Sequence, residues 1–359
     1  MSALAEAVAT AEVVVCCGTG GVGKTTTSAA LGLQAASIGR RAVVVTIDPA
    51  KRLADALGVP GGLGNDPVRL PIETAGGGEL WALMLDTATT FDGLVAANAA
   101  NPQQAERILG NAFYRNVAGS FSGTQDYMAA ERLHALHGDD RFDVVIVDTP
   151  PTRNALDFLD APGVITRFLD HPLFKMMMLP TRRGLRMLNL ATQPVLRSIG
   201  RVVGGDVLAD AIAFFQAFDG METGFRRRAD EVLALLRSDV THYVLVASPR
   251  GDTVDEAAYF AERLRAAGLD VDALIVNRST PTFGELPERR PRSAAAAALY
   301  DNLVELHAAS AQEHRHLAAL LDELCLDPDE ATVWVPLLAG DVHDLDGLST
   351  IRALLFGRA

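Results

Sequence analysis

The chain has 359 residues, more than a typical single domain, so we expect one enlarged α/β domain or a domain that carries a substantial insertion. Its composition is 49% hydrophobic and 21% charged, close to ordinary globular usage, which argues against a disordered chain. The formal net charge of -13 argues against binding to nucleic acid or to an anionic lipid surface, unless the basic residues are clustered.

The composition of the first residues is not the one expected of a secretory signal. Residues 1–12 contain two glutamates and no lysine or arginine, so the basic segment of a secretory signal is missing. No apolar run reaches the roughly 18 residues that a transmembrane helix needs. The three cysteines, Cys16, Cys17 and Cys325, cannot build a disulfide framework or a C-x-x-C site. We therefore expect a protein of the reducing cytoplasm, with at most a peripheral association with a membrane.

Short runs rich in Val and Ile recur between longer segments of helical pattern. They are apolar at every position, as expected of parallel strands that are buried on both faces. The runs are residues 13–17, 42–47, 144–147, 243–247, 274–276 and 333–335. Helices are predicted between them, for example at 25–37 and 253–267, each followed by a glycine that suits a left-handed C-cap. This alternation predicts an α/β fold, doubly wound, with a mostly parallel sheet.

Residues 18–25 match the phosphate-binding pattern G-x-x-x-x-G-K-[ST], directly after a predicted strand and at the start of a predicted helix. The glycines let backbone N–H groups turn toward phosphates, and the helix N-terminus adds partial positive charge. We expect Lys24 to bridge the β- and γ-phosphates of ATP, and the Thr25 hydroxyl to bind Mg²⁺. The predicted ATP-binding residues of this P-loop are Gly20, Gly21, Val22, Gly23, Lys24, Thr25 and Thr26.

Two stretches, residues 87–137 and 161–237, do not fit the alternation, because they contain helical patterns broken by Gly and Pro and no convincing strand. We predict that they form a helical subdomain inserted into the nucleotide-binding core, which comprises residues 12–86, 138–160 and 238–359. Residues 58–78 are predicted to be a long loop, and residues 294–298 are a strong helix former.

Asp148 ends the predicted strand 144–147, at the edge of the sheet where ligands bind in folds of this class. Mg²⁺ prefers to keep several of its waters, so we expect Asp148 to hold the ion through its water shell. The alternative is a structural aspartate at the start of a Pro-rich turn.

Several motifs together resemble a known family. Residues 20–26 are similar to the deviant Walker A loop of the MinD/ParA/nitrogenase-iron-protein class of dimeric ATPases. With residues 46–50 and 148–152, the chain resembles the ArsA family, which includes arsenite-pump ATPases and ATPases that target tail-anchored membrane proteins. The resemblance continues through 276–278 and 335–338, and so covers most of the chain. It implies an ATPase that cycles between open and closed dimers to capture and release a hydrophobic client, or to engage a membrane complex.

The resemblance also implies roles for single residues. Asp48 corresponds to the switch I carboxylate that orients the attacking water, so Asp48 and Lys24 are the expected catalytic residues. An ordinary aspartate suffices, because positioning dominates phosphoryl transfer. Asp48 would also suit the N-cap of a helix over residues 50–57. Residues 148–152 resemble switch II, which couples loss of the γ-phosphate to movement of client-binding helices.

The adenine base is expected to lie at the far end of the site. By resemblance, the amide of Asn277, with Arg278 beside it, contacts the edge of the base. The loop that starts at Pro336 and Leu337 packs on the base from the other side. Capping of a loop is the alternative role of Asn277.

The chain departs from the family at Thr19. The class places a lysine at this position, which reaches across the dimer to the phosphates of the partner, and threonine cannot supply that charge. Hydrolysis is then slow, or a paralogous subunit that keeps its lysine completes the site in a heterodimer, or another basic residue substitutes. An ATP-binding regulatory subunit is therefore one alternative function. A positioning ATPase of the ParA/MinD type is another, which the two arginines within residues 348–359 do not favour.

The chain also lacks the C-x-x-C zinc clamp and the clustered cysteines found in the family, so no structural zinc and no metalloid is expected. The histidine pairs His134 with His137 and His314 with His316 are expected to be surface residues.

A cluster of methionines among basic residues suits either a hydrophobic client groove or the core of the helical subdomain. It comprises Met176, Met177, Met178 and Met187.

Overall fold

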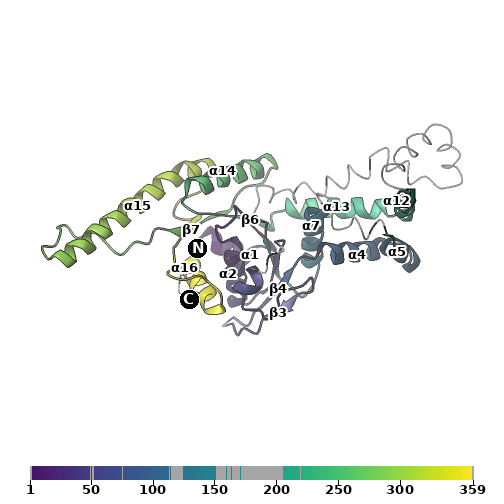
Figure 1. Ribbon diagram of the computed structural model, residues 1–359, viewed down its shortest axis with the longest axis horizontal. Coiled ribbons are helices and arrows are strands. Elements are labelled where there is room, and N and C mark those ends of the chain that lie inside the picture. The colour runs from purple at the N-terminus through teal and green to yellow at the C-terminus, as the bar shows by residue number, and fades with distance from the viewer. Residues whose placement is uncertain are drawn as a thin grey trace. The chain divides into compact units, whose positions relative to one another are not determined.

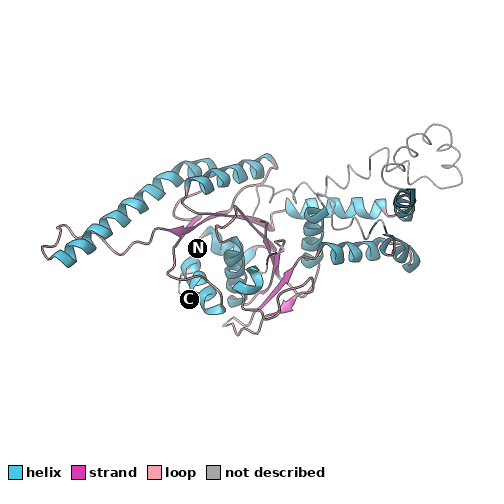
Figure 2. Cartoon of the chain, in the orientation of Figure 1, coloured by secondary structure: helices cyan, strands magenta, loops and turns pink. Residues whose placement is uncertain are grey.

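A computed structural model of the chain describes residues 2–48, 50, 52–74, 76–112, 114, 124–150, 159, 163, 170, 205–218 and 220–357 (Figures 1 and 2). The chain divides into two compact units. The first, here the sheet unit, comprises Met1–Met84, Leu136–Leu156 and Arg237–Ala359. The second, here the helical unit, comprises Leu85–Ala135 and Asp157–Leu236.

The described part of the sheet unit contains one eight-stranded sheet, in the order β3-β4-β2-β5-β1-β6-β7-β8. Every neighbouring pair is parallel except β3 and β4, which are antiparallel at one edge. The strands are β1 (Val13–Gly18), β2 (Arg41–Thr46), β3 (Val68–Arg69), β4 (Glu79–Met84), β5 (Val144–Asp148), β6 (Thr241–Ala247), β7 (Ala273–Ser279) and β8 (Thr332–Pro336). The predicted doubly wound, mostly parallel α/β sheet is therefore confirmed.

Each of the predicted apolar runs forms or overlaps a strand, and two further strands lie where none was predicted. β3 interrupts the segment 58–78, so the prediction of a continuous loop there was wrong. β4 follows directly, and in it buried and half-buried positions partly alternate. Its half-buried Glu79 and Trp81 break the continuous apolar pattern that marks the central strands.

Helices cover the sheet and explain why its strands are apolar on both faces. The helices of the sheet unit are α1 (Ala3–Thr10), α2 (Lys24–Ser37), α3 (Arg52–Ala56), α14 (Gly251–Ala266), α15 (Ala294–Leu324) and α16 (Leu345–Phe356). The helices α1 and α16 pack against α2, which lies on the central strands (Figure 1). Alternate residues of β1, such as Val14 and Cys16, belong to the hydrophobic core between these helices and the sheet. α14 packs on β1 and β6, and α15 packs on α14.

The helix boundaries agree with the sequence patterns where a glycine ends the helix and differ elsewhere. α2 and α14 are followed by Gly39 and Gly268, with φ of 96° and 76°, which is the conformation expected of a glycine C-cap. α3 is shorter than the predicted helix 50–57, and α15, with 31 residues, is far longer than the predicted segment 294–298. α1 and α16 were not predicted, and both begin at a side-chain cap, Ser2 and Asp344 respectively.

The helical unit contains α4 (Thr87–Asn98), α5 (Pro102–Leu109), α12 (Gly205–Ala217) and α13 (Glu222–Leu236). A further helix, α7 (Thr124–His137), runs from this unit into the sheet unit. Aromatic side chains, among them Tyr114, Phe214 and Phe218, form the core of the helical unit. The methionine cluster, predicted to form a groove or a core, lies outside the described residues.

Among the described helices, none combines the length and the apolarity that crossing a membrane requires.

Candidate functional site

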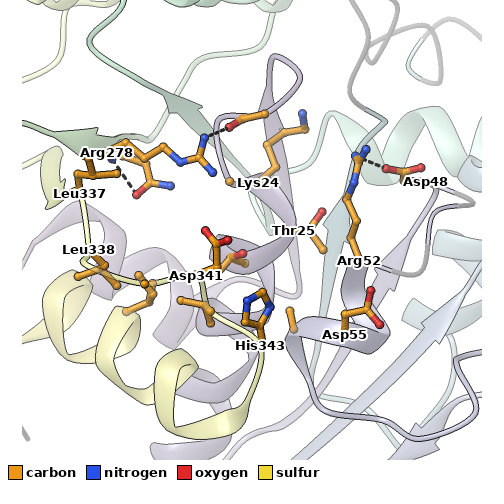
Figure 3. A pocket seen from close by; sticks show the side chains of 18 of the residues that line it. Lys24, Thr25, Asp48, Arg52, Asp55, Arg278, Leu337, Leu338, Asp341 and His343 are labelled. Carbon is orange, nitrogen blue, oxygen red and sulfur yellow. Dashed lines mark hydrogen bonds and ion pairs between the residues drawn. The ribbon is translucent and has the colours of Figure 1, made fainter.

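A pocket of about 570 Å³ opens at the edge of the sheet unit where β2, β5, β7 and β8 end (Figure 3). Carboxyl ends of parallel strands meet at one edge, so segments far apart in the sequence converge there. Most of the predicted site residues line this pocket: Gly21, Gly23, Lys24, Thr25, Thr26, Asp48, Asn277, Arg278, Pro336 and Leu337. Gly20 is exposed on the P-loop, and Val22 is buried beneath it.

Two glycines of the P-loop are required by close approaches of neighbouring groups. Gly18, with φ of 147°, lies so close to β6 that an added Cβ would collide with the carbonyl of Val246. At Gly23, with φ of 95°, a Cβ would collide with the side-chain amide of Asn277. The loop therefore holds its shape only with glycine at these positions.

Lys24 is the first residue of α2 and is 5% exposed. Its ammonium donates a hydrogen bond of 2.6 Å to the backbone carbonyl of Thr19. Burial lowers the pKa of Lys24 below its ordinary value, and the charges of Asp148 and Asp48 oppose this shift. The ammonium is therefore held inside the loop.

Asp148, the last residue of β5, lies wholly buried behind Thr25 and does not line the pocket itself. Its Oδ2 accepts hydrogen bonds from the hydroxyls of Thr25, at 2.8 Å, and Thr46, at 2.9 Å. Burial raises the pKa of Asp148 to about 6, and the hydrogen bonds of Thr25 and Thr46 limit the rise. Among the described residues, no donor reaches its Oδ1, although that oxygen is buried.

This pair suits a magnesium ion. Mg²⁺ takes oxygen ligands and is commonly held by one or two side chains, with waters and substrate phosphates completing its shell. The Thr25 hydroxyl and the unsatisfied carboxylate oxygen of Asp148 are such ligands, and they adjoin the P-loop. A bound cation would also remove the cost of burying an unpaired carboxylate.

Asp48 follows β2 at the rim of the pocket and is 8% exposed. Its Oδ1 accepts a hydrogen bond of 3.0 Å from the backbone N–H of Ala50, and its Oδ2 pairs with Nη1 of Arg52 at 2.8 Å. The bond to Ala50 spans two residues, as in an Asx turn, so it fixes the turn before α3. The neighbouring Pro49 lies outside the described residues, as do residues 151–152 of the switch II motif.

Asn277 and Arg278 tie β7 to the P-loop. The side-chain amide of Asn277 donates to the carbonyl of Val22 at 2.7 Å, and Nη1 of Arg278 donates to the carbonyl of Gly21 at 2.8 Å. Arg278 adopts a φ of 60° at an irregularity in the pairing of β7 with β8. The strained backbone is therefore kept where two side chains clamp the loop. Because its amide already holds Val22, Asn277 has a structural role that the sequence presented only as an alternative.

The pocket also contains residues that the sequence did not single out. Arg52 of α3 lies beside Asp48, and Asp341 and His343 extend into the pocket from the loop after β8 (Figure 3). Thr46, the last residue of β2, holds Asp148 from below. The sequence could have predicted the contact of Arg52, because this residue follows Asp48 by four positions at the start of a helix, and such a spacing favours an ion pair. The contact of Thr46 required knowledge that β2 and β5 are neighbours.

In the described part of the chain, no three side chains of His, Cys, Asp or Glu gather into a group that could hold a metal. Cys16 and Cys17 are buried, and burial raises the pKa of both thiols. His137 pairs with Glu12 at 2.7 Å. The absence of structural zinc and of metalloid stays a prediction.

Comparisons with known proteins agree with this geometry. The family model described as "Anion-transporting ATPase" matches residues 11–290. The chain is 24% identical to the putative arsenical pump-driving ATPase 1 of Aquifex aeolicus, over 75% of this chain and 64% of that protein. It is 24% identical to ATPase GET3 of Malassezia globosa, over 95% of this chain and 90% of that protein. It is 28% identical to ATPase get3 of Aspergillus terreus, over 73% of this chain and 71% of that protein.

Proposed function

The chain belongs to the anion-transporting ATPase family, and from this membership we propose that it couples Mg-ATP hydrolysis to the opening and closing of a dimer. Membership makes the chain an ATPase of the ArsA type, as its motifs predicted. The observation that carries the proposal is the pocket itself, in which the P-loop, Asp48 and the end of β8 surround one cavity, with Asp148 buried behind Thr25.

We assign the reacting phosphates to the P-loop end of the pocket. The backbone of residues 20–26 and the ammonium of Lys24 would hold the β- and γ-phosphates. Mg²⁺, held by Thr25 and through water by Asp148, would supply charge neutralisation on the phosphate oxygens. The burial of the Lys24 ammonium inside the loop, where it donates to the carbonyl of Thr19, supports this placement.

Asp48 is proposed to orient the attacking water by accepting a hydrogen bond from it. The water oxygen bonds to the γ-phosphorus while the bond to the bridging oxygen breaks, and the electron pair of that bond stays on ADP. Of the two water protons, one remains on the inorganic phosphate and one passes to solvent. The position of Asp48 at the rim of the pocket that Lys24 also lines supports this role.

The adenine is proposed to lie between Asn277 and Arg278 on one side and Pro336 and Leu337 on the other. All four line the pocket, and Leu337 is 59% exposed, so an apolar surface is open to a flat base. A half-buried amide that already donates to Val22 would act here chiefly by holding the P-loop against the base.

The kind of partner that this protein binds is proposed from its similarity to known proteins, because the nucleotide pocket gives no information about it. Proteins named arsenical pump-driving ATPase and GET3 align with most of this chain, which supports a hydrophobic protein client or a membrane complex as partner. We place the protein in the cytoplasm, with a peripheral association with the membrane, as a homodimer or as a heterodimer with a lysine-bearing paralogue. The helical subdomain of residues 87–137 and 161–237 is proposed to bind the partner.

A second function, an ATP-binding regulatory subunit with slow hydrolysis, is favoured by one observation. The side chain of Thr19 is 2% exposed and carries no charge, so position 19 offers no cation to a partner subunit.

The first test is the removal of Lys24, the cation aimed at the β- and γ-phosphates. Lys24→Ala should lose measurable binding of a slowly hydrolysed ATP analogue in the presence of Mg²⁺, by calorimetric titration. Arg250→Ala, which removes an exposed cation outside the pocket, is the matched control and should bind as the natural chain does. Equal affinities of the natural chain and Lys24→Ala would refute the assignment of the site.

A further inference from the structure

Position 19 leaves the site short of one positive charge, because the threonine there is buried and its hydroxyl has no partner among the described residues. Developing charge on the phosphoryl oxygens is usually stabilised by more than the P-loop lysine, and an added arginine is worth orders of magnitude in rate. Another side chain that reaches the same end of the pocket could supply this charge.

Three basic residues among those described, Lys24, Arg52 and Arg278, line the pocket with their side chains. Lys24 belongs to the P-loop, and the guanidinium of Arg278 is engaged with the carbonyl of Gly21, beside Leu337 and the proposed base (Figure 3). Arg52 lies on the opposite side. Its side chain extends from α3 past Thr25 and ends beside Asp48 (Figure 3). It is therefore the described cation that faces the γ-phosphate end without being part of the loop.

The ion pair between Arg52 and Asp48 is weak enough for a phosphate to replace Asp48 as the partner of the guanidinium. Among the described residues the pair has one hydrogen bond, from Nη1 to Oδ2 at 2.8 Å, and the arginine side chain is 60% exposed while that of Asp48 is 11% exposed. Ion pairs of this exposure are weak. A phosphate offers the guanidinium two parallel hydrogen bonds and a larger negative charge, so it competes well for the same group.

The same contact occupies the carboxylate that hydrolysis needs. Oδ1 of Asp48 is bound to the N–H of Ala50, and Oδ2 faces Arg52. Each carboxylate oxygen can accept two hydrogen bonds, so departure of Arg52 frees an acceptor position on Oδ2 for a water molecule that Asp48 would orient. One movement of one side chain would then both supply a cation and release the carboxylate.

We propose that Arg52 replaces the missing lysine: on ATP binding its guanidinium moves from Asp48 to the γ-phosphate, within the same subunit. This inference rests on the proposed function. It assigns Arg52 as a catalytic residue, and it makes the Asp48–Arg52 pair a latch that keeps the carboxylate engaged until a γ-phosphate is present. ADP, which has no γ-phosphate, leaves the latch closed.

The test compares affinities for ADP and for a slowly hydrolysed ATP analogue, by calorimetric titration with Mg²⁺, in four proteins. These are the natural chain, Arg52→Ala, Asp48→Asn and the double variant. Arg52→Ala should lower the preference for the analogue over ADP by roughly tenfold or more, because a charge-assisted contact to the γ-phosphate is lost. Affinity for ADP should stay within about twofold.

The double variant separates the latch from a simpler role. If Arg52 merely neutralises Asp48, its removal has no effect once Asp48 is an asparagine. If Arg52 contacts the γ-phosphate, Arg52→Ala should lower the preference for the analogue in the Asp48→Asn background as well. No loss in that background would overturn the inference.

Hydrolysis provides an independent measurement. Arg52→Ala should lower kcat by about 10²-fold or more, while Arg290→Ala should leave it unchanged. Arg290 is a matched control, because it is also an exposed arginine paired with an aspartate, Asp301, and lies outside the pocket. Parental hydrolysis by Arg52→Ala would reject this inference and leave the proposed ATPase intact. Failure of the natural chain to bind either nucleotide would instead reject the proposed function.

Discussion

At the scale of single residues, the pocket places two aspartates in different surroundings and so prepares them for different tasks. Asp148 is wholly buried, and burial raises its pKa to about 6. Asp48 lies at the rim, where a backbone N–H and an arginine hold it. A buried carboxylate with an unsatisfied oxygen suits a metal ion, whereas a carboxylate at the rim can meet a water molecule.

The substitution Asp48→Asn tests whether Asp48, at the rim of the pocket, orients the attacking water. The amide keeps the size of the side chain and loses the charged acceptor that orients water, so ATP should bind at least as tightly while hydrolysis falls by about 10²-fold or more. Phosphate release assays and calorimetric titration would measure both quantities. Asp252→Asn, on the exposed first turn of α14, should change neither. Turnover of Asp48→Asn at the parental rate would mean that Asp48 only shapes the turn before α3.

Asp148 should make the stability of the nucleotide-free protein depend on pH. Its pKa is raised in the folded state, so its protonation stabilises the fold below the unfolded value near 4, and this contribution is lost as the pH rises through about 6. Between pH 5 and pH 7 the loss should be about 1 kcal/mol.

Urea unfolding at both pH values, for the natural chain and for Asp148→Asn, would isolate this contribution. Both tryptophans, Trp81 and Trp334, lie in β4 and β8, so their fluorescence reports on the sheet unit. The free energy of unfolding of Asp148→Asn relative to the natural chain should rise between pH 5 and pH 7. A difference that does not vary with pH would contradict the raised pKa.

At the scale of elements, the site depends on how closely α2 lies on the sheet. Gly32, in the middle of α2, faces β2, β4 and β5. A Cβ added there would lie 2.6 Å from Cγ2 of Val44 and 2.8 Å from Cδ1 of Leu80. The absence of a side chain at this position lets the helix that carries Lys24 and Thr25 approach β5, which ends at Asp148, and β2, which precedes Asp48.

Gly32→Ala should therefore destabilise the protein, although alanine is the better helix former. Overpacking costs roughly 1–3 kcal/mol, which exceeds a helix-propensity gain of at most about 1 kcal/mol. We expect the free energy of unfolding to fall by about 1 kcal/mol, measured by urea unfolding with tryptophan fluorescence. Gly251→Ala, in the first turn of α14 with open space around it, should not lower it. A stabilising effect of Gly32→Ala would show that α2 can shift without cost.

At the scale of the whole molecule, the net charge of -13 opposes the association of two chains. The proposed closed dimer must overcome this repulsion through its nucleotides and its interface. Salt screens charges beyond roughly 8 Å at physiological ionic strength. Association should therefore respond to salt as well as to ATP.

We expect the ATP analogue with Mg²⁺ to convert the protein to a dimer, and the dimer to be tighter at about 300 mM than at about 50 mM salt. Sedimentation velocity at saturating nucleotide would measure both effects. Lys24→Ala, which should not bind the nucleotide, is the control that should remain unassociated. A monomer at every salt concentration, with nucleotide bound, would rule out dimer closure as the coupling step.

Much of the fold and part of the site were determined by the sequence alone, because they depend on residues that are close together in it. The P-loop is one continuous motif, and continuous apolar runs predicted six of the eight described strands because parallel strands are buried on both faces. The family followed from several such motifs in order. β4 was missed because half-buried Glu79 and Trp81 interrupt its apolar pattern.

The tertiary structure alone decided which distant side chains meet. Thr46 holds Asp148 because β2 and β5 are neighbours, and Asn277 holds Val22 because β7 ends beside the P-loop. Strand order results from packing of the whole sheet unit, and no local pattern encodes it.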